Sequence, residues 1–288
     1  MKLGRYYIDL NHCLGEDFSE YEFDDQGVPL TRFNRKPNWK YNPITVSQYG
    51  LHHFNHYLKS HSENSKKIFL KQAEWLVENI EDGPNGSKVW YYQIAMPFYE
   101  ISAPWISGMA QGQALSVLLR AHQLTGEEIY LNVVNQAFLV FNVSAKKGGV
   151  VSCFPDGNPV IEEYVSAKFM IAVLNGFIFA IFGIYDFKIY TDDFGANQLF
   201  NKLVDSLKQN LYRYDCGYWS YYDLKFPLRL SSKPYHRIHL DQLDELYNIT
   251  GEEQFRNYRD QWQDYLSSPI CNLKWALRKL HQKLFIRI

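Results

Sequence analysis

The stretch WISGMAQGQALSVLLRAHQLTGEEIYLNVVNQAFLVF, residues 105–141, decides the fold. Its first half places side chains on one helix face, namely Met109, Leu115, Leu118, Leu119 and His122. Thr125-Gly126 ends that helix, and Glu127-Glu128 opens the next one at the end where acidic side chains are favourable. The helical period then continues through Ile129, Val133, Val134, Ala137 and Phe138. The stretch therefore predicts two helices joined by a tight turn.

The same hairpin returns along the chain. Residues 246–266, LYNITGEEQFRNYRDQWQDYL, repeat the Thr-Gly-Glu-Glu turn and follow it with aromatic side chains. A weaker copy spans residues 49–76, and a fourth spans residues 169–211. Repeated helix pairs bury their faces against their neighbours. We therefore expect a mainly α protein, an incomplete (α/α) toroid built from repeated helix hairpins, with short strands and irregular loops at its groove.

Composition divides the chain into three parts. Residues 1–40 are rich in Gly, Asp, Glu, Asn and Pro and predict an irregular arm packed over the helical body. Residues 41–268 form the predicted toroid. Residues 269–288 are a basic, amphipathic tail, CNLKWALRKLHQKLFIRI from Cys271 onward. Such a helix can lie on an anionic membrane surface or dock on the protein body or a partner, and both readings stay open.

Charge and cysteine content exclude several classes of protein. A formal net charge of −1 argues against a nucleic-acid partner, which needs a basic stripe. The four cysteines are widely spaced, and the N-terminus has no apolar segment, so we expect a cytoplasmic protein that could sit at the inner membrane surface. His52, His53 and His56 lack a partner acid in metal-binding spacing, and we expect no metal. The 22 tyrosines suit contacts with sugars.

Three further segments hold candidate site residues. Residues 169–185 are apolar on nearly all sides and predict a buried helix, whose apolar run is broken at Asn175 and Gly176. Residues 212–226 predict a hairpin or extended loop. Residues 233–242, KPYHRIHLDQ, gather basic and aromatic side chains, and we expect them outside regular helices, where sites are common.

Taken together, these segments resemble the D-glucuronyl C5-epimerase family, which turns glucuronate into iduronate within heparan-type polysaccharides. The resemblance covers roughly residues 27–266 and rests on dispersed motifs in a fixed order. These are Gly27 to Leu30, Pro43-Ile44, Gln48 to Leu51, Trp75 to Val77, Gly108 to Gln113, Glu162 to Tyr164, Val173 to Phe177, Tyr185-Asp186, Tyr222 to Leu224, and Tyr235-His236 with His239.

The resemblance implies an architecture and a reaction. The family's catalytic domain is an incomplete toroid, and the β domain that animal members insert before Trp75 is absent here, so the chain looks like a minimal, prokaryotic relative. The reaction is epimerisation at carbon 5 of D-glucuronate residues in a polysaccharide, without a cofactor. Animal members dimerise through the helical domain, so a homodimer is a further expectation.

Removing the proton α to a carboxylate and returning it on the other face needs two proton-transfer groups and donors for the carboxylate. By resemblance, Tyr235 and Glu163 are the opposed pair, assisted by Tyr164 and Tyr222. The substrate-binding candidates are Lys225, where the family has Arg, together with Arg237, His236, His239, Gln111 and Asn175. The family also uses a tyrosine from its N-terminal segment, and the match before Gly27 does not choose among Tyr6, Tyr7 and Tyr21.

Two departures from the family pattern keep other functions open. Ser232 and Lys233 stand where the family has a basic and aromatic pair, which puts substrate contacts there in doubt. A uronate polysaccharide lyase begins with the same deprotonation, and a glycoside hydrolase would need two positioned carboxylates. A non-catalytic glycan-binding or assembly protein is the third alternative.

Overall fold

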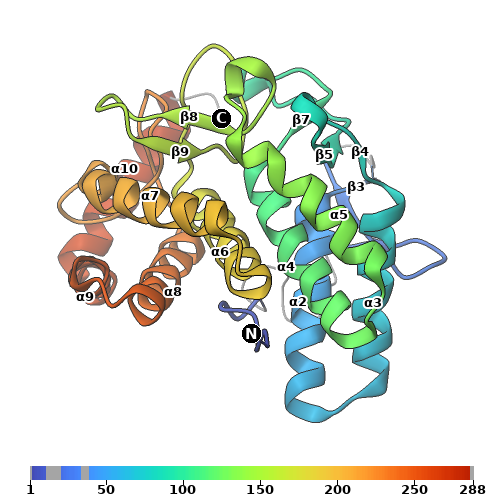
Figure 1. The fold of residues 1–288 in the computed structure, drawn as a ribbon. Helices are drawn as coiled ribbons and strands as arrows, with labels where there is room; N and C mark the ends of the chain where they lie inside the picture. Colours follow the sequence, from blue (N-terminus) through green and yellow to red (C-terminus); the bar gives the residue numbers. More distant parts are fainter. Residues whose placement is uncertain (1, 11–20, 34–38, 286–288) are drawn as a thin grey trace.

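This computed structural model describes residues 2–10, 21–33 and 39–285. Its body consists of four helix hairpins, followed by one more helix (Figure 1). In chain order the helices are α2 (Pro43–Ser60), α3 (Glu63–Glu78), α4 (Gly108–Thr125), α5 (Glu128–Phe138), α6 (Leu174–Thr191), α7 (Phe194–Asn210), α8 (Lys233–Thr250), α9 (Glu253–Ser267) and α10 (Pro269–Phe285).

The first helices of the four hairpins form an inner row. Helix α2 packs on α4, α4 on α6, and α6 on α8, while α3, α5, α7 and α9 each pack on the inner helix of their own hairpin. The protein is therefore mainly α and forms an incomplete (α/α) toroid, as the sequence predicted.

Local sequence explains why these hairpins form. Gly126 ends α4 with φ 75°, and Gly251 ends α8 with φ 71°, in the left-handed region that glycine adopts without strain. At the other ends, Ser107 caps α4 and Ser232 caps α8 by accepting a hydrogen bond from a first-turn amide. The two Thr-Gly-Glu-Glu turns thus act as the sequence predicted.

The strands are short antiparallel pairs. A three-stranded sheet joins β1 (Glu22–Phe23), β2 (Pro29–Arg32) and β3 (Trp39–Tyr41). The two-stranded pairs are β4 (Glu81–Asp82) with β5 (Lys88–Val89), β6 (Tyr91–Tyr92) with β7 (Trp105–Ile106), β8 (Val151–Cys153) with β9 (Pro159–Ile161), and β10 (Tyr221–Asp223) with β11 (Arg229–Leu230). In Figure 1 most of them lie above one end of the inner helices.

The closest helix contact is the crossing of α4 and α6. A Cβ atom on Gly183 would lie 2.1 Å from the backbone oxygen of Gly112, so only glycine allows the two backbones to approach this closely. Both helices are buried over most of their length. They form the centre of the core on which the other elements pack.

The first described residues belong to this core. Leu3, Tyr6, Ile8 and Leu10 are buried among the helices. They lie beside a buried ion pair in which Arg120 of α4 and Asp186 of α6 are 2.5 Å apart. The Tyr7 hydroxyl donates to Asp186 over 2.6 Å, and Arg120 donates to the Gly4 carbonyl over 3.2 Å. The N-terminal segment therefore packs into the body as well as over it.

Two segments differ from the sequence prediction. Residues 169–173 are not helical, because the Glu162 carboxylate accepts hydrogen bonds from the amides of Ile171 and Ala172 over 3.0 and 2.7 Å. Helix α6 begins only at Leu174, so Asn175 lies in its first turn. Residues 233–242, which we expected outside regular helices, form the first half of α8.

Candidate active site

A pocket of about 310 Å³ lies where the inner helices begin. It is as large as the smaller small-molecule sites of proteins. Its lining comes from the arm and from the first turns of α2, α4, α6 and α8, together with the segment before α6. The lining residues are Tyr21, Thr31, Asn42, Ile44, Thr45, Gln48, Met109, Glu163, Tyr164, Asn175, Phe179, Pro234, Tyr235 and Ile238.

This position surrounds the pocket with helix N-termini, and its described lining contains no lysine or arginine. The N-terminus of each helix carries about half a positive charge, and four helix N-termini lie around the pocket. Val173, the residue just before α6, offers no capping side chain for the first amides of that helix. Such an arrangement attracts an anion such as a carboxylate.

Glu163 is the carboxylate of the pocket. It is buried, and burial raises its pKa to about 7. Its Oε2 atom has no hydrogen-bond partner among the described residues. A Cβ atom on Gly176 would lie 2.4 Å from that oxygen, so glycine at this position leaves room for the carboxylate. Glu163 can therefore accept and release a proton near neutral pH.

Tyr235 lies in the first turn of α8 and lines the same pocket. Its side chain is 39% exposed, whereas Glu163 is buried. The Tyr235 ring stands edge-on to the Tyr222 ring, with their centroids 5.0 Å apart. A phenol that is open to the pocket can transfer a proton to a bound molecule.

Hydrogen bonds link Glu163 to Tyr164 and Tyr164 to Tyr222. The Tyr164 ring stacks on Tyr99, with centroids 4.5 Å apart, which fixes its orientation. Burial raises the pKa of Tyr164 and of Tyr222 well above the usual value, so both stay protonated at neutral pH. Protonated phenols can donate hydrogen bonds to the Glu163 carboxylate and to a ligand.

A buried charged cluster supports these tyrosines. Asp223 of β10 pairs with Arg229 of β11, and Arg229 also donates to the Tyr99 hydroxyl. The Tyr99 hydroxyl in turn donates to Asp223 over 2.7 Å. The guanidinium of Arg229 lies 5.3 Å from the centroid of the Tyr222 ring. The cluster therefore supports Tyr222 and Tyr99, and its Arg229 cation is neutralised by the Asp223 carboxylate.

A family comparison covers the part of the chain that holds most of this site. The model of the D-glucuronyl C5-epimerase C-terminus matches residues 84–264, which is more than half of the chain and includes Glu163, Tyr222 and Tyr235. The chain belongs to the D-glucuronyl C5-epimerase family. The resemblance inferred from the dispersed motifs is thereby confirmed.

Two relatives show how far the likeness of this family member extends. This chain is 32% identical over 264 residues to an uncharacterized protein of Methanocaldococcus jannaschii, and the aligned residues cover 85% of each chain. It is 32% identical over 221 residues to the D-glucuronyl C5-epimerase of Caenorhabditis elegans, which covers 70% of this chain. The matched part is 35% of the worm enzyme, so this chain corresponds to about a third of that protein.

Solved structures agree on the fold. The cellobiose 2-epimerase of Bacillus thermoamylovorans matches 87% of this chain and 67% of its own, with a TM-score of 0.60 and 9% identity. The unsaturated glucuronyl hydrolase of Bacillus sp. GL1 matches 77% of this chain and 61% of its own, with a TM-score of 0.51 and 15% identity. At such identities the likeness concerns the toroid alone, which carries both epimerases and hydrolases.

The geometry sorts the site residues expected for a D-glucuronyl C5-epimerase family member. Tyr235, Glu163, Tyr164 and Asn175 line one pocket, and Tyr222 contacts two of them. The side-chain oxygen of Asn175 is buried and has no hydrogen-bond partner among the described residues. Asn175 is therefore placed to bind a ligand.

Three of the substrate-binding candidates, all on α8, lie elsewhere. His236 and His239 are buried behind Tyr235, where both contact the Ser220 hydroxyl. Arg237 lines a separate hollow with Asp241 and Arg259. The reason is that α8 is a helix, so consecutive side chains point in different directions.

Gln111 and Lys225 also lie outside the pocket lining. Gln111 is fully buried in α4 and donates to the carbonyl of Trp90 over 3.3 Å. The Lys225 ammonium lies 4.8 Å from the centroid of the Phe98 ring and 5.3 Å from that of Phe169. Arg229, which the sequence analysis did not single out, is the cation that contacts the tyrosine cluster.

The structure also separates the three N-terminal tyrosines. Tyr21 lines the pocket. Tyr6 is buried in the core, and Tyr7 is bonded to Asp186. Tyr21 is therefore the tyrosine of the N-terminal segment that the geometry favours.

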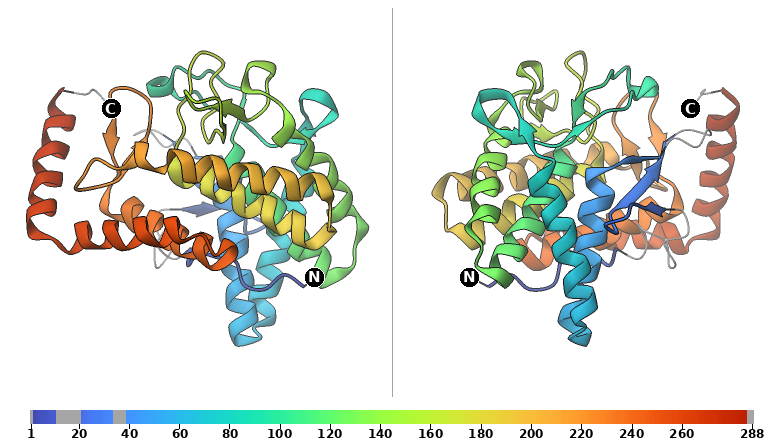
Figure 2. Two further views of the ribbon diagram at one scale, coloured as in Figure 1. Left: turned by 60° about the vertical axis from the view of Figure 1, so that its left-hand side comes forward. Right: turned by 90° about the vertical axis from the view of Figure 1, so that its right-hand side faces the viewer.

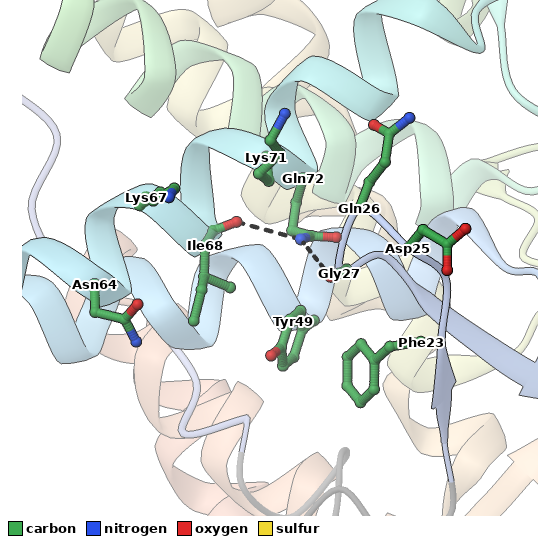
Figure 3. A pocket seen from close by; sticks show the side chains of 10 residues that line it. All are labelled: Phe23, Asp25, Gln26, Gly27, Tyr49, Asn64, Lys67, Ile68, Lys71 and Gln72. Carbon is green, nitrogen blue, oxygen red and sulfur yellow. Dashed lines mark hydrogen bonds between the residues drawn. The ribbon is translucent and has the colours of Figure 1, made fainter.

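A larger hollow of about 590 Å³ lies between β1, α2 and α3 (Figure 3). Its polar lining includes Asp25, Lys67, Lys71 and the Gln72 amide, whose nitrogen donates to the carbonyls of Ile68 and Gly27. It lacks a buried carboxylate and phenol pair among the described residues. This hollow therefore lacks the groups that would remove a proton from carbon, although its volume is larger than that of the pocket around Glu163.

Proposed function

We propose that this chain epimerises carbon 5 of D-glucuronate residues within a polysaccharide, giving L-iduronate. The observation that carries the proposal is a single pocket that holds both a buried carboxylate with a pKa of about 7, Glu163, and an open phenol, Tyr235. Membership of the D-glucuronyl C5-epimerase family supports the same reaction. The fold and the family are those of carbohydrate epimerases.

In this mechanism Glu163 and Tyr235 act on opposite faces of the sugar ring. The Glu163 carboxylate accepts the proton from carbon 5, and the Tyr235 phenol returns a proton on the other face. Tyr164 holds Glu163 through a hydrogen bond and is itself held by Tyr222, and both tyrosines take part in relaying the Glu163 proton. No redox step is needed, because the substrate and the product are stereoisomers.

The intermediate carries its extra charge on the substrate carboxylate. The four helix N-termini and the side chain of Asn175 would stabilise that charge. These groups take the place of a bidentate arginine in the pocket.

The described lining disfavours a glycoside hydrolase. Such enzymes use two carboxylates that flank the scissile bond. Glu163 is the one acidic side chain in the described pocket lining, and Glu162 is turned away to hold residues 171 and 172. A lyase shares the first proton transfer, so the product has to distinguish it from an epimerase.

The test is hydrogen exchange at carbon 5. The full chain is incubated in deuterated water with heparosan or an unsulfated chondroitin backbone, and proton NMR follows carbon 5. Deuterium at carbon 5 with iduronate signals and unchanged chain length supports the proposal. An unsaturated, shortened product would instead assign a lyase, and the absence of exchange with every glucuronate polymer would refute an epimerase.

Tyr235→Phe provides the site-specific test. The phenol supplies one of the two proton transfers. We therefore expect the rate of iduronate formation, measured with deuterium exchange at carbon 5, to fall by roughly 100-fold or more. Circular dichroism should stay unchanged, since the Tyr235 residue is 39% exposed and lines the pocket rather than the core. Tyr212→Phe, which changes an exposed tyrosine outside the pocket, is the matched control. Full activity of Tyr235→Phe would remove Tyr235 from the mechanism.

A further inference from the structure

Helix α10 is attached to the body through the face that carries Trp275, Lys279 and Gln282. The Trp275 indole donates to the Ser231 carbonyl over 3.0 Å, and Lys279 donates to the Leu230 carbonyl over 2.9 Å. Gln282 donates to the Leu228 carbonyl over 3.0 Å. These three side chains recur at helical spacing, so they form one face of α10, and this face docks on the strand β11 region.

The opposite face of α10 is aliphatic and open. It consists of side chains spaced alternately by three and four residues, each between 56% and 68% exposed, which we call the aliphatic stripe: Ile270, Leu273, Leu277, Leu280 and Leu284. A surface helix normally turns its apolar face inward, and α10 does the reverse. In Figure 2 the helix lies along the outer edge of the molecule in both views. An aliphatic stripe of this length indicates an interaction surface.

The charge around the stripe is of one sign. Residues 269–288 contain five Lys and Arg and no Asp or Glu, whereas residues 1–268 contain 25 Lys and Arg against 31 Asp and Glu. Lys274, Arg278 and Lys283 are exposed on α10. The surface that covers the stripe must therefore accept aliphatic side chains and carry negative charge.

A second copy of the chain fits these requirements poorly. Pairing α10 with its own copy would bring two exclusively basic helices together, and like charges beside a helix seam are repulsive. The other exposed apolar side chains of the described residues are scattered over separate elements, for example Phe194 on α7 and Phe226 between β10 and β11. They offer no matching stripe for a different mode of pairing.

We propose that α10 lies on an anionic membrane surface, with its aliphatic stripe among the lipid chains and its basic side chains at the headgroups. This is the known behaviour of basic amphipathic helices at lipid interfaces, where apolar burial and electrostatic attraction add. The helix does not cross the bilayer, because no helix among the described residues is long and apolar enough to do so. Docking through Trp275, Lys279 and Gln282 keeps the stripe turned outward before any contact with lipid.

The experiment is flotation of the full chain with phosphatidylcholine vesicles, with and without phosphatidylglycerol. We expect flotation with the anionic vesicles only, and weaker flotation at high salt because exposed charges are screened. Leu273→Ser combined with Leu277→Ser should reduce the bound fraction roughly tenfold or more without changing circular dichroism. Phe194→Ser, which removes an even more exposed apolar side chain from α7, should float like the unchanged chain.

Three results would overturn the proposal. The first is no flotation with anionic vesicles, and the second is equal flotation of the double variant. The third is a dimer in light scattering that the double variant converts to a monomer, which would show that a second copy covers the stripe. None of these readouts uses catalytic activity, because the stripe lies outside the candidate active site.

Discussion

At the residue scale, the raised pKa of Glu163 predicts how activity depends on pH. In the proposed mechanism Glu163 accepts the proton from carbon 5, so the active form of the site has an ionised Glu163 carboxylate. The apparent kcat/KM for exchange at carbon 5 should therefore rise with pH, roughly tenfold per unit below about 7, and level off above it. Glu163→Gln should abolish exchange. A flat profile between pH 5 and pH 8 would exclude Glu163 as the base.

The same pKa predicts the stability of Glu163→Gln. Burial raises the pKa of Glu163 from 4.5 to about 7, so the folded state holds its proton more tightly than the unfolded state. The free energy of unfolding contributed by this group is highest below pH 4.5 and decreases as pH rises towards 7. Glutamine removes this loss, so the variant should gain roughly 1–3 kcal/mol relative to the unchanged chain between pH 5 and pH 8. Urea unfolding at pH 5 and at pH 8 measures the difference in unfolding free energy between the variant and the unchanged chain. The same difference at both pH values would contradict the prediction.

Residue types and motif order were enough to predict Glu163, Tyr164, Tyr222, Tyr235 and Asn175 as neighbours. They were not enough for Arg229, since its role arises from the fold of the β10–β11 hairpin, which brings it to Asp223 and Tyr222. The basic residues beside Tyr235 looked equally suitable in the sequence. Only the helix period of α8 shows that they face other directions.

At the scale of elements, the crossing of α4 and α6 can be tested with one methyl group. Gly183→Ala would place a Cβ atom 2.1 Å from the Gly112 backbone, which cannot yield without separating the helices. We expect a loss of at least about 1–3 kcal/mol in unfolding free energy, seen as a lower urea midpoint. Gly195→Ala, at an exposed position near the start of α7, is the control and should be close to neutral. Equal midpoints for both variants would show that α4 and α6 do not cross this closely.

The hairpins were predictable because their signals are local. Glycine closes α4 and α8, and acidic residues follow at the start of the next helix. The start of α8 carried signals of the same kind, a capping Ser232 and Pro234 in the first turn. The concentration of histidine, arginine and tyrosine there led to a loop prediction instead. The non-helical segment before α6 had no such local signal, because distant Glu162 fixes its amides.

At the scale of the whole molecule, the candidate site forms only when the four helix hairpins pack together. Its lining draws on residues from Tyr21 to Ile238, and each inner helix contributes its first turn. A helix start is visible in sequence, but the convergence of four starts is not. The toroid thus gathers four helix N-termini and one carboxylate around a space that no single segment could form. This explains why site residues could be recognised by family resemblance before their geometry could be predicted.

The last prediction compares the two ends of the chain. Removing residues 1–10 takes Leu3, Tyr6, Ile8 and Leu10 out of the core and leaves Asp186 without Tyr7. At about 1.5–3 kcal/mol for each buried apolar side chain, the loss is comparable with the whole stability of a typical domain. We expect this truncation not to fold cooperatively in thermal unfolding followed by circular dichroism.

Removing residues 269–288 should be far milder. This truncation uncovers Trp219, on which Trp275 packs with ring centroids 5.5 Å apart, but it leaves the four hairpins and the pocket intact. We expect a cooperative transition at a modestly lower temperature, with exchange at carbon 5 retained and vesicle flotation lost. If the chain without residues 1–10 were the more stable of the two, the N-terminal segment would be a covering rather than part of the core. The contrast between the two truncations thus separates what holds the toroid together from what α10 presents to its surroundings.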